Sequence, residues 1–105
     1  MAEAREGDPA ELAPALRDLT YAYVFHGRHD DALAVGREAR HLFEALGDRS
    51  GLAEVHNHLG LAHWNRVQYD SAVANLERAR ELWVEADDPS ALGRVYNNLC
   101  AAHYR

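Results

Sequence analysis

Asparagine side chains recur at a fixed interval in this chain. Asn57 and Asn97 lie 40 residues apart, and Asn98 follows directly after. An asparagine amide both donates and accepts hydrogen bonds, so such a set can hold the backbone of an extended peptide without reading its sequence. The same amides can also bond neighbouring helices to one another. The sequence leaves both interpretations open and makes these three residues candidates for a peptide-binding site.

The seven histidines raise the question of a metal site or a nuclease. His56-Asn57-His58 has the letters of the HNH nuclease motif, but that motif needs a ββ-metal context and the pattern here is helical. Because they are two residues apart on a helix, His56 and His58 point to different faces. No two histidines have the i, i+4 spacing, with a nearby acid, that helical zinc sites use. We therefore expect no metal ligands.

Patterns for covalent or cofactor chemistry are also missing. Cys100 is the single cysteine and aligns with Gly60 in the repeat described below, where helices should pack tightly, so we expect it in the core. No Gly-x-Ser-x-Gly sequence and no P-loop occurs. The acidic residues between 81 and 88 are typical of a solvated helix face. We predict no enzymatic activity, no catalytic residues and no cofactor.

Composition narrows the class of protein further. The net charge of −6 disfavours direct nucleic-acid binding, because phosphate contacts need clustered Lys and Arg. No stretch is long and apolar enough to span a membrane, and the N-terminus lacks the apolar core of a signal peptide. We expect a soluble, cytoplasmic protein without membrane contact. All eleven basic residues are Arg and nineteen residues are Ala, which is typical of a GC-rich bacterial genome.

The chain repeats itself every 40 residues. Residues 11–50 and 51–90 align without gaps and share twelve identical positions, among them Leu19/Leu59, Ala32/Ala72 and Asp48/Asp88. Residues 91–105 begin a third copy. A fixed period of this size marks a repeat array, and such arrays present surfaces more often than they perform chemistry.

Each repeat contains two helical patterns, with apolar residues at spacings of three and four. The expected helices span about 9–26, 29–46, 49–66, 69–86 and 89–104. Connections of two to three residues make successive helices antiparallel neighbours. The sequence therefore predicts an all-α fold, an antiparallel helix-pair solenoid of about five helices.

Aspartate and glycine recur where these helices should begin and end. An aspartate carboxylate can accept hydrogen bonds from the free N–H groups of a first turn. We expect such caps from Asp8, Asp48 and Asp88 before the first helix of each repeat, and from Asp30 or Asp70 at the second helices. Gly27 and Gly47 lie where helix ends are expected. Pro14 would fall inside the helix over 9–26, so that helix should start nearer Ala13 or bend there.

The run Leu59-Gly60-Leu61-Ala62-His63, followed by Tyr69-Asp70-Ser71-Ala72, resembles the tetratricopeptide repeat. The chain departs from that pattern where Gly60 becomes Thr20 and Cys100, and in its period of 40 rather than 34. The longer period is similar to the repeats of kinesin light chains and of bacterial signal-transduction ATPases and antibiotic-regulatory proteins. The resemblance implies a single array over 1–105, with repeats at about 9–48 and 49–88 and a half repeat at 89–105.

In that family the first helices of the repeats line a concave groove. The resemblance therefore implies a peptide-binding groove that contains Arg17, Tyr21, Asn57, His58, Leu61, Trp64, Asn97 and Asn98. Trp64 would anchor a partner side chain there, or lie buried under the next repeat. Trp83 is expected in the core or between repeats.

Together these features predict a non-enzymatic module that binds a protein or peptide, as part of a larger bacterial regulatory or signalling protein. The chain begins on what resembles the end of an earlier second helix and ends on a first helix, so we expect it to be a segment of a longer array. The alternative is self-association, in which homo-oligomers form through the uncovered apolar faces of the first and last helices.

Overall fold

The computed structural model describes residues 8–103, and all five expected helices are present in that range. Their ends differ from the expected ends by no more than one residue. The helices are α2 (Pro9–Phe25), α3 (His29–Leu46), α4 (Arg49–Asn65), α5 (Tyr69–Ala86) and α6 (Pro89–His103). The described residues include no strand. The fold class predicted from the 40-residue period, an all-α arrangement of antiparallel helix pairs, is confirmed.

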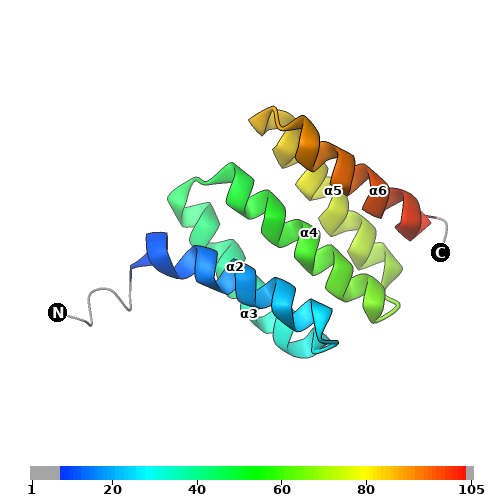
Figure 1. The fold of residues 1–105 in the computed structure, drawn as a ribbon, viewed down its shortest axis with the longest axis horizontal. Coiled ribbons are helices and arrows are strands. Elements are labelled where there is room, and N and C mark those ends of the chain that lie inside the picture. The colour runs from blue at the N-terminus through cyan, green and yellow to red at the C-terminus, as the bar shows by residue number, and fades with distance from the viewer. Residues whose placement is uncertain (1–7, 104–105) are drawn as a thin grey trace.

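The helices form two layers (Figure 1). The front layer consists of α2, α4 and α6, and the rear layer consists of α3 and α5. Each helix packs against the next along the chain, and α4 also contacts α2 and α6 within its own layer. The alternation follows from the short connections, which leave a helix no room except beside its predecessor. Residues 40 apart therefore have equivalent places on neighbouring helices of one layer.

Aspartate caps begin every helix of the front layer. The Oδ1 atoms of Asp8, Asp48 and Asp88 accept hydrogen bonds from the backbone N–H groups of the first turn, at 3.0, 2.9 and 3.1 Å respectively. These groups have no partner within the helix, so the carboxylate satisfies a donor that would otherwise need water. The predicted caps at the front-layer helices are confirmed.

The rear-layer helices begin differently, and the caps predicted from Asp30 and Asp70 are wrong. The N-cap residues are Arg28 and Gln68, neither of which makes a side-chain cap hydrogen bond. Both helices begin one residue before the aspartate, so each carboxylate lies within the first turn. There its negative charge interacts favourably with the positive end of the helix dipole, but it accepts no hydrogen bond as a cap. Asp30 instead pairs with Arg66 in the loop after α4.

Four residues at the helix ends have a left-handed backbone. Gly27 and Gly47 have φ angles of 76° and 71°, as expected for residues that end a helix. Val67 and Asp87 occupy the equivalent places 40 residues later, with φ angles of 64° and 57°. A β-branched valine is strained in this conformation, because its Cβ crowds the following carbonyl oxygen.

Helix α2 begins at Pro9 and continues through Pro14, so the expected start near Ala13 is wrong. Asp8 caps the first turn, and Pro9 at the first helical position loses no hydrogen bond there. Pro14 removes only the bond that the Ala10 carbonyl would accept. Ala10 is exposed, so water can replace that bond.

Small residues let the helices approach closely. Eight alanines in the described helices are fully buried: Ala13, Ala32, Ala39, Ala53, Ala62, Ala72, Ala79 and Ala91. Larger side chains fill the space between them, and Trp83, Phe43 and Leu76 are each 1% exposed. Trp83 thus lies in the core, as expected. The contact is closest at Gly51, where a Cβ atom would lie 2.3 Å from Cε1 of Phe43.

The two outer helices of the front layer each leave one face uncovered. Leu59 of α4 is 3% exposed, whereas Leu19, its equivalent in α2, is 38% exposed. Cys100 of α6 is exposed, although its equivalent Gly60 is buried. The expectation that Cys100 lies in the core is therefore wrong, because no described helix follows α6 as α5 follows α4.

None of the described helices is both long enough and apolar enough to cross a membrane.

Candidate functional site

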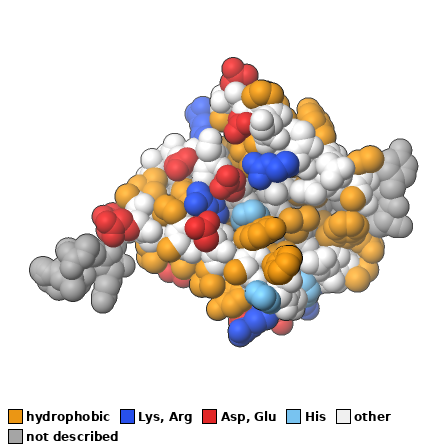
Figure 2. Space-filling model, viewed as in Figure 1, with side chains coloured by type: hydrophobic (Ala, Val, Ile, Leu, Met, Phe, Trp, Pro, Cys, Tyr) orange, Lys and Arg blue, Asp and Glu red, His pale blue; other side chains and the backbone are white. Residues whose placement is uncertain are grey.

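A groove of about 670 Å³ lies on the front layer, between α2, α4 and α6. In Figure 2, which views this face, side chains of both charge signs gather around a histidine, with hydrophobic side chains beside them. We call this feature the ligand groove. It is lined by Arg17, Asp18, Tyr21, Glu54, Asn57, His58, Arg94, Asn97 and Asn98. Six of the eight predicted site residues are among these nine.

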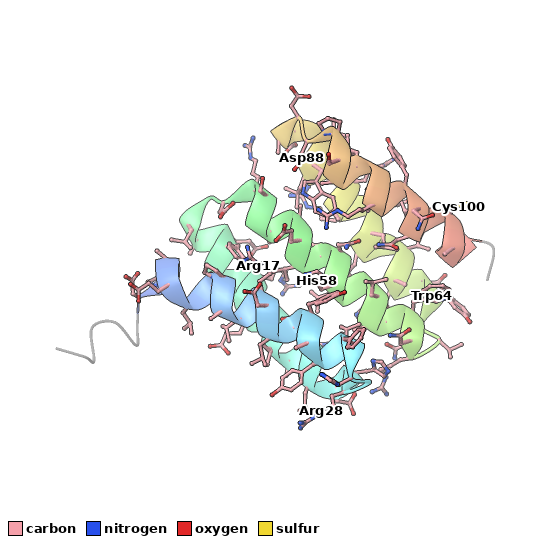
Figure 3. All side chains as sticks on the ribbon, in the orientation of Figure 1. Arg17, Arg28, His58, Trp64, Asp88 and Cys100 are labelled. Carbon is pink, nitrogen blue, oxygen red and sulfur yellow. The ribbon has the colours of Figure 1, made fainter. Side chains whose placement is uncertain are left out.

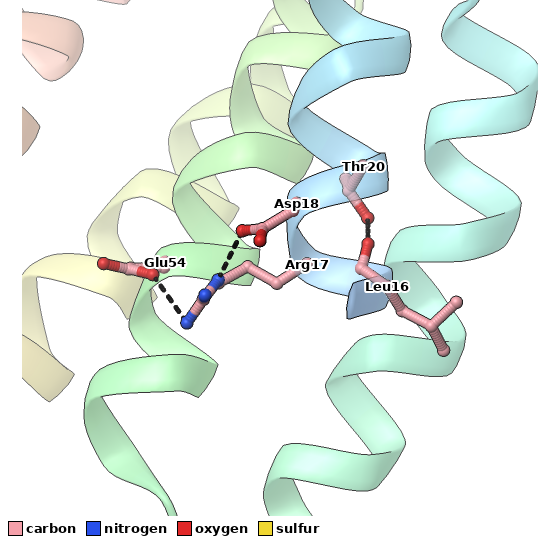
Figure 4. Close-up of polar contacts among 5 residues, drawn as sticks. All are labelled: Leu16, Arg17, Asp18, Thr20 and Glu54. Atoms are coloured by element: carbon pink, nitrogen blue, oxygen red, sulfur yellow. Dashed lines mark hydrogen bonds and ion pairs between the residues drawn. The ribbon is translucent and has the colours of Figure 1, made fainter. Parts of the chain in front are cut away.

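Arg17 crosses from α2 to α4 at one end of the ligand groove (Figure 4). Its Nε donates to Oδ1 of Asp18 at 3.1 Å, and its Nη1 lies 3.3 Å from Oε1 of Glu54. The arginine side chain is only 27% exposed, so screening by water is limited. The two carboxylates therefore compensate the Arg17 charge and hold its side chain in one place. Close by, the buried hydroxyl of Thr20 donates to the Leu16 carbonyl at 2.7 Å and needs no other partner.

His58 lies beside Arg17 at the centre of the face (Figure 3). Its ring packs against Tyr21, with the ring centroids 5.1 Å apart. Burial, the largest cause, together with the positive charges of Arg17 and Arg94 lowers the pKa of His58 to about 4, while Asp18 opposes the shift. The imidazole is therefore neutral at pH 7. Its Nδ1 is buried and has no hydrogen-bond partner among the described residues.

Asn57 and Asn98 join α4 to α6. Nδ2 of Asn98 donates to Oδ1 of Asn57 at 2.9 Å, and Asn57 is only 5% exposed. The sequence allowed these asparagines either to bind a peptide or to bond neighbouring helices. For Asn57 and Asn98 the structure shows a bond between neighbouring helices. Asn97 differs, because its side chain is exposed and makes no hydrogen bond to another described residue. Its amide lies on the wall of the ligand groove with no partner among residues 8–103.

Arg94 and Glu54 line the ligand groove although they were not among the predicted site residues. The Arg94 guanidinium lies 5.4 Å from the centroid of the Trp83 ring, a cation–π contact, and forms no ion pair within residues 8–103. Helix periodicity could have indicated both residues. Each lies four positions before a predicted site residue, His58 or Asn98, and so shares its helix face.

Leu61 and Trp64 lie outside the lining of the ligand groove. Leu61 is half-buried against the core. Trp64 is half-buried near the C-terminal end of α4, away from His58 (Figure 3). Both residues lie further along α4 than the point at which α2, α4 and α6 enclose the groove.

The two histidines of the run His56-Asn57-His58 contact different helices. Nδ1 of His56 lies 2.9 Å from Oδ1 of Asn75 in α5, whereas His58 faces α2. Burial lowers the pKa of His56, despite the hydrogen bond to Asn75. The part of the chain that the structure describes contains no group of three or more His, Cys, Asp or Glu side chains placed to hold a metal ion.

Neither a protein-family model nor a curated protein sequence matches this chain. The fold and the chemistry of the ligand groove are therefore the observations on which a function can rest.

Proposed function

We propose that this chain is a non-enzymatic binding module that holds an extended segment of a partner protein in the ligand groove. The observation that supports the proposal is the contrast between bonded and unbonded asparagines in the groove wall. Asn57 and Asn98 form a bonded pair between two helices, and Asn97 beside them keeps its amide free. A fixed wall with a free amide is suited to bind a peptide backbone, because little side-chain freedom remains to be lost on binding.

The polar groups of the groove match the needs of an extended peptide. Such a peptide leaves its own N–H and C=O groups unpaired, and Asn97 can bond one of each. Arg94 offers a guanidinium to a carboxylate of the partner, since it has no ion pair within the described range. Tyr21 is 51% exposed at the opposite wall and offers an aromatic surface to an apolar side chain.

The chemistry of the groove argues for binding rather than catalysis. Arg17 is held by two carboxylates, and the low pKa of His58 leaves it neutral at pH 7 with an occluded Nδ1. A general base must reach a substrate proton, and this nitrogen is buried.

The proposal also concerns the class of repeat that the chain contains. The 40-residue period and the buried alanines at the helix crossings support a tetratricopeptide-like module, in which the first helix of each pair faces the ligand. We further propose that this module belongs to a larger bacterial regulatory or signalling protein, on the strength of the sequence resemblance.

The test is selection of extended peptides from a display library against the native chain. The variant Asn97→Ala loses the free amide, and Asn65→Ala is its matched control, because Asn65 is exposed on α4 outside the groove lining. We expect enriched peptides that bind the native chain and Asn65→Ala but not Asn97→Ala. Failure to enrich any peptide, or equal binding by all three proteins, would contradict the proposal.

Self-association is a second candidate function, favoured by the uncovered faces of the outer helices. Leu19 is 38% exposed on α2 and Tyr96 is 52% exposed on α6, and such apolar surface could be buried between copies of the chain. Sedimentation equilibrium from micromolar to millimolar concentration tests it. A mass that rises with concentration supports self-association, and a monomer throughout excludes it.

A further inference from the structure

The α2 side of the ligand groove carries an excess of negative charge. Arg17 is bonded to Asp18 and lies 3.3 Å from Glu54, so two carboxylates surround a single guanidinium. Each carboxylate uses one oxygen on Arg17, Oδ1 of Asp18 and Oε1 of Glu54. The Asp18 side chain is 74% exposed, so its other oxygen can accept a hydrogen bond from a cation of a partner.

The α6 wall of the groove carries the opposite charge. Arg94 is exposed, lines the groove and forms no ion pair within residues 8–103. Its guanidinium lies 5.4 Å from the centroid of the Trp83 ring, a contact that restrains the side chain without neutralising its charge. The groove is therefore negative at α2 and positive at α6, with α4 between them (Figure 1).

The unpaired charge of Arg94 comes from a difference between the two contacts of the front layer. Arg94 lies one repeat after Glu54, and Asn57 lies one repeat after Arg17. Glu54 meets Arg17 between α2 and α4, whereas the equivalent places between α4 and α6 hold a cation and a neutral amide that already bonds Asn98. The charge imbalance therefore arises between two described helices that contact each other.

We propose that the extended segment that, on the function proposed above, occupies the ligand groove crosses α4 from α2 to α6, with a basic side chain beside Asp18 and an acidic side chain beside Arg94. The guanidinium of Arg94 can donate two parallel hydrogen bonds to a carboxylate. A segment with two basic residues would place one of them against Arg94, and a segment with two acidic residues would place one against Asp18. Like charges in contact disfavour both alternatives.

The distance between the two walls sets the spacing of the two charges in the partner. Packed helices have axes about 8–10 Å apart, so the axes of α2 and α6 are about 16–20 Å apart across α4. Asp18 and Arg94 both reach the groove, which shortens the span between their charges. Four residues of extended chain cover about 13 Å, and side chains four positions apart point to the same side. We therefore expect the basic and acidic residues to lie four positions apart.

The test is a competition among four display libraries of extended peptides that have two fixed residues, four positions apart, in otherwise random sequence. The fixed residues are one Arg and one Glu in either order, two Arg, two Glu, or two Gln. Selection is performed against the native chain, Arg94→Glu and Asp18→Arg. The matched controls are Arg37→Glu and Glu38→Arg, which make the same changes of net charge at exposed positions of α3 outside the groove lining.

We expect the native chain to enrich the library with one Arg and one Glu about fivefold over the others, which corresponds to about 1 kcal/mol, the upper range for an exposed ion pair. Arg94→Glu should instead prefer two Arg, and Asp18→Arg should prefer two Glu. Both controls should keep the native preference. Thermal melting of each variant confirms that it is folded, and the exposure of Asp18 makes its variant the safer of the two.

Two results would overturn this proposal and leave the peptide-binding function standing. One is equal enrichment of the four libraries in peptides that Asn97→Ala fails to bind. The other is a preference for one Arg and one Glu that persists in both Arg94→Glu and Asp18→Arg. If neither these libraries nor an unrestricted one yields a peptide that binds the native chain, the proposed function fails together with the charge assignment.

Discussion

Helices α4 and α6 have equivalent places in the front layer, yet their equivalent residues do different things. Asn57 of α4 is 5% exposed and bonded to Asn98, while Asn97 of α6 is exposed with a free amide. Gly60 of α4 is packed against Leu76, while Cys100 of α6 lies on an open face. Helix α4 contacts α2, α3, α5 and α6, whereas α6 lacks a rear-layer helix beyond it among the described residues.

The difference shows that place in the array decides whether a repeated residue serves packing or remains available to a partner. A polar group binds a ligand only if no neighbouring helix already uses its hydrogen bonds. In the groove, Asn97 and Arg94 of α6 have no hydrogen bond or ion pair to another described side chain, whereas Asn57 of α4 is bonded to Asn98.

The largest effect is expected from truncating Leu59. Leu59→Ala removes a side chain that is 3% exposed, and we expect a loss of about 3 kcal/mol in the free energy of unfolding, the range for a buried leucine whose cavity does not collapse. Leu19→Ala, at the equivalent and 38% exposed place, should cost about 1 kcal/mol. Urea unfolding of both variants measures the difference. Equal losses in the free energy of unfolding would contradict the contrast between the buried and the exposed position.

A larger side chain should destabilise the fold at Gly60 but not at Cys100. Gly60→Leu places its Cβ 2.8 Å from Cγ of Leu76, so we expect a loss of about 2 kcal/mol or more in the free energy of unfolding. Cys100→Leu adds volume on an exposed face and should change it by less than about 0.5 kcal/mol. The pair is compared by thermal melting monitored by circular dichroism. A Cys100→Leu variant as unstable as Gly60→Leu would mean that the face of α6 is covered.

The neutral state of His58 should make stability depend on pH. The pKa of about 4 in the folded chain lies below the unfolded value of 6.5, so the unfolded state binds the proton more readily between these values. Stability is therefore full above pH 6.5 and falls as the pH drops towards 4, by on the order of 2 kcal/mol between pH 7 and pH 5. His56, whose pKa is also lowered, adds to the loss.

The variant His58→Gln isolates this contribution, because an amide does not titrate in that range. Urea unfolding at pH 7 and pH 5 should show a smaller pH effect in His58→Gln than in the native chain. An identical pH effect in both proteins would show that His58 titrates with an ordinary pKa.

The smallest effect concerns the turns after the front-layer helices. Val67 has a φ of 64°, at the place where Gly27 has 76°. Val67→Gly should raise the free energy of unfolding by about 1 kcal/mol, because glycine adopts this backbone without strain. Gly27→Val should lower it by a similar amount, although neither site is packed. Melting temperatures that fail to move in opposite directions would contradict the strain assigned to Val67.

The sequence predicted the helices closely, because the 40-residue period and the aspartate caps are local signals. The caps assigned to Asp30 and Asp70 were wrong, since the left-handed residues before them determine where the rear-layer helices begin. The packing of Cys100 was wrong for a different reason. Whether a residue is buried depends on the helix that lies against it, and the pattern of its own helix does not contain that information.

The candidate site was predictable only in part. The resemblance to the tetratricopeptide repeat predicted that Arg17, Tyr21 and His58 line one groove, and the structure brings them together. Arg94, which forms no ion pair within residues 8–103, was missed, although it lies one turn before Asn98. Which asparagine is bonded could not be read from the chain either, because Asn57 and Asn97 have the same place in the repeat and differ only in their neighbours.

The most direct test of the account is calorimetric titration of one selected peptide into the native chain, Asn97→Ala and Asn57→Ala, with urea unfolding of each protein. We predict that Asn97→Ala weakens peptide binding about tenfold and leaves stability within about 0.5 kcal/mol. Asn57→Ala should lower the free energy of unfolding by about 1–2 kcal/mol, because it leaves the Asn98 amide without its partner. Unchanged peptide affinity in Asn97→Ala, or equal loss of stability in the two variants, would contradict the central claim that the free amide of α6 holds the ligand.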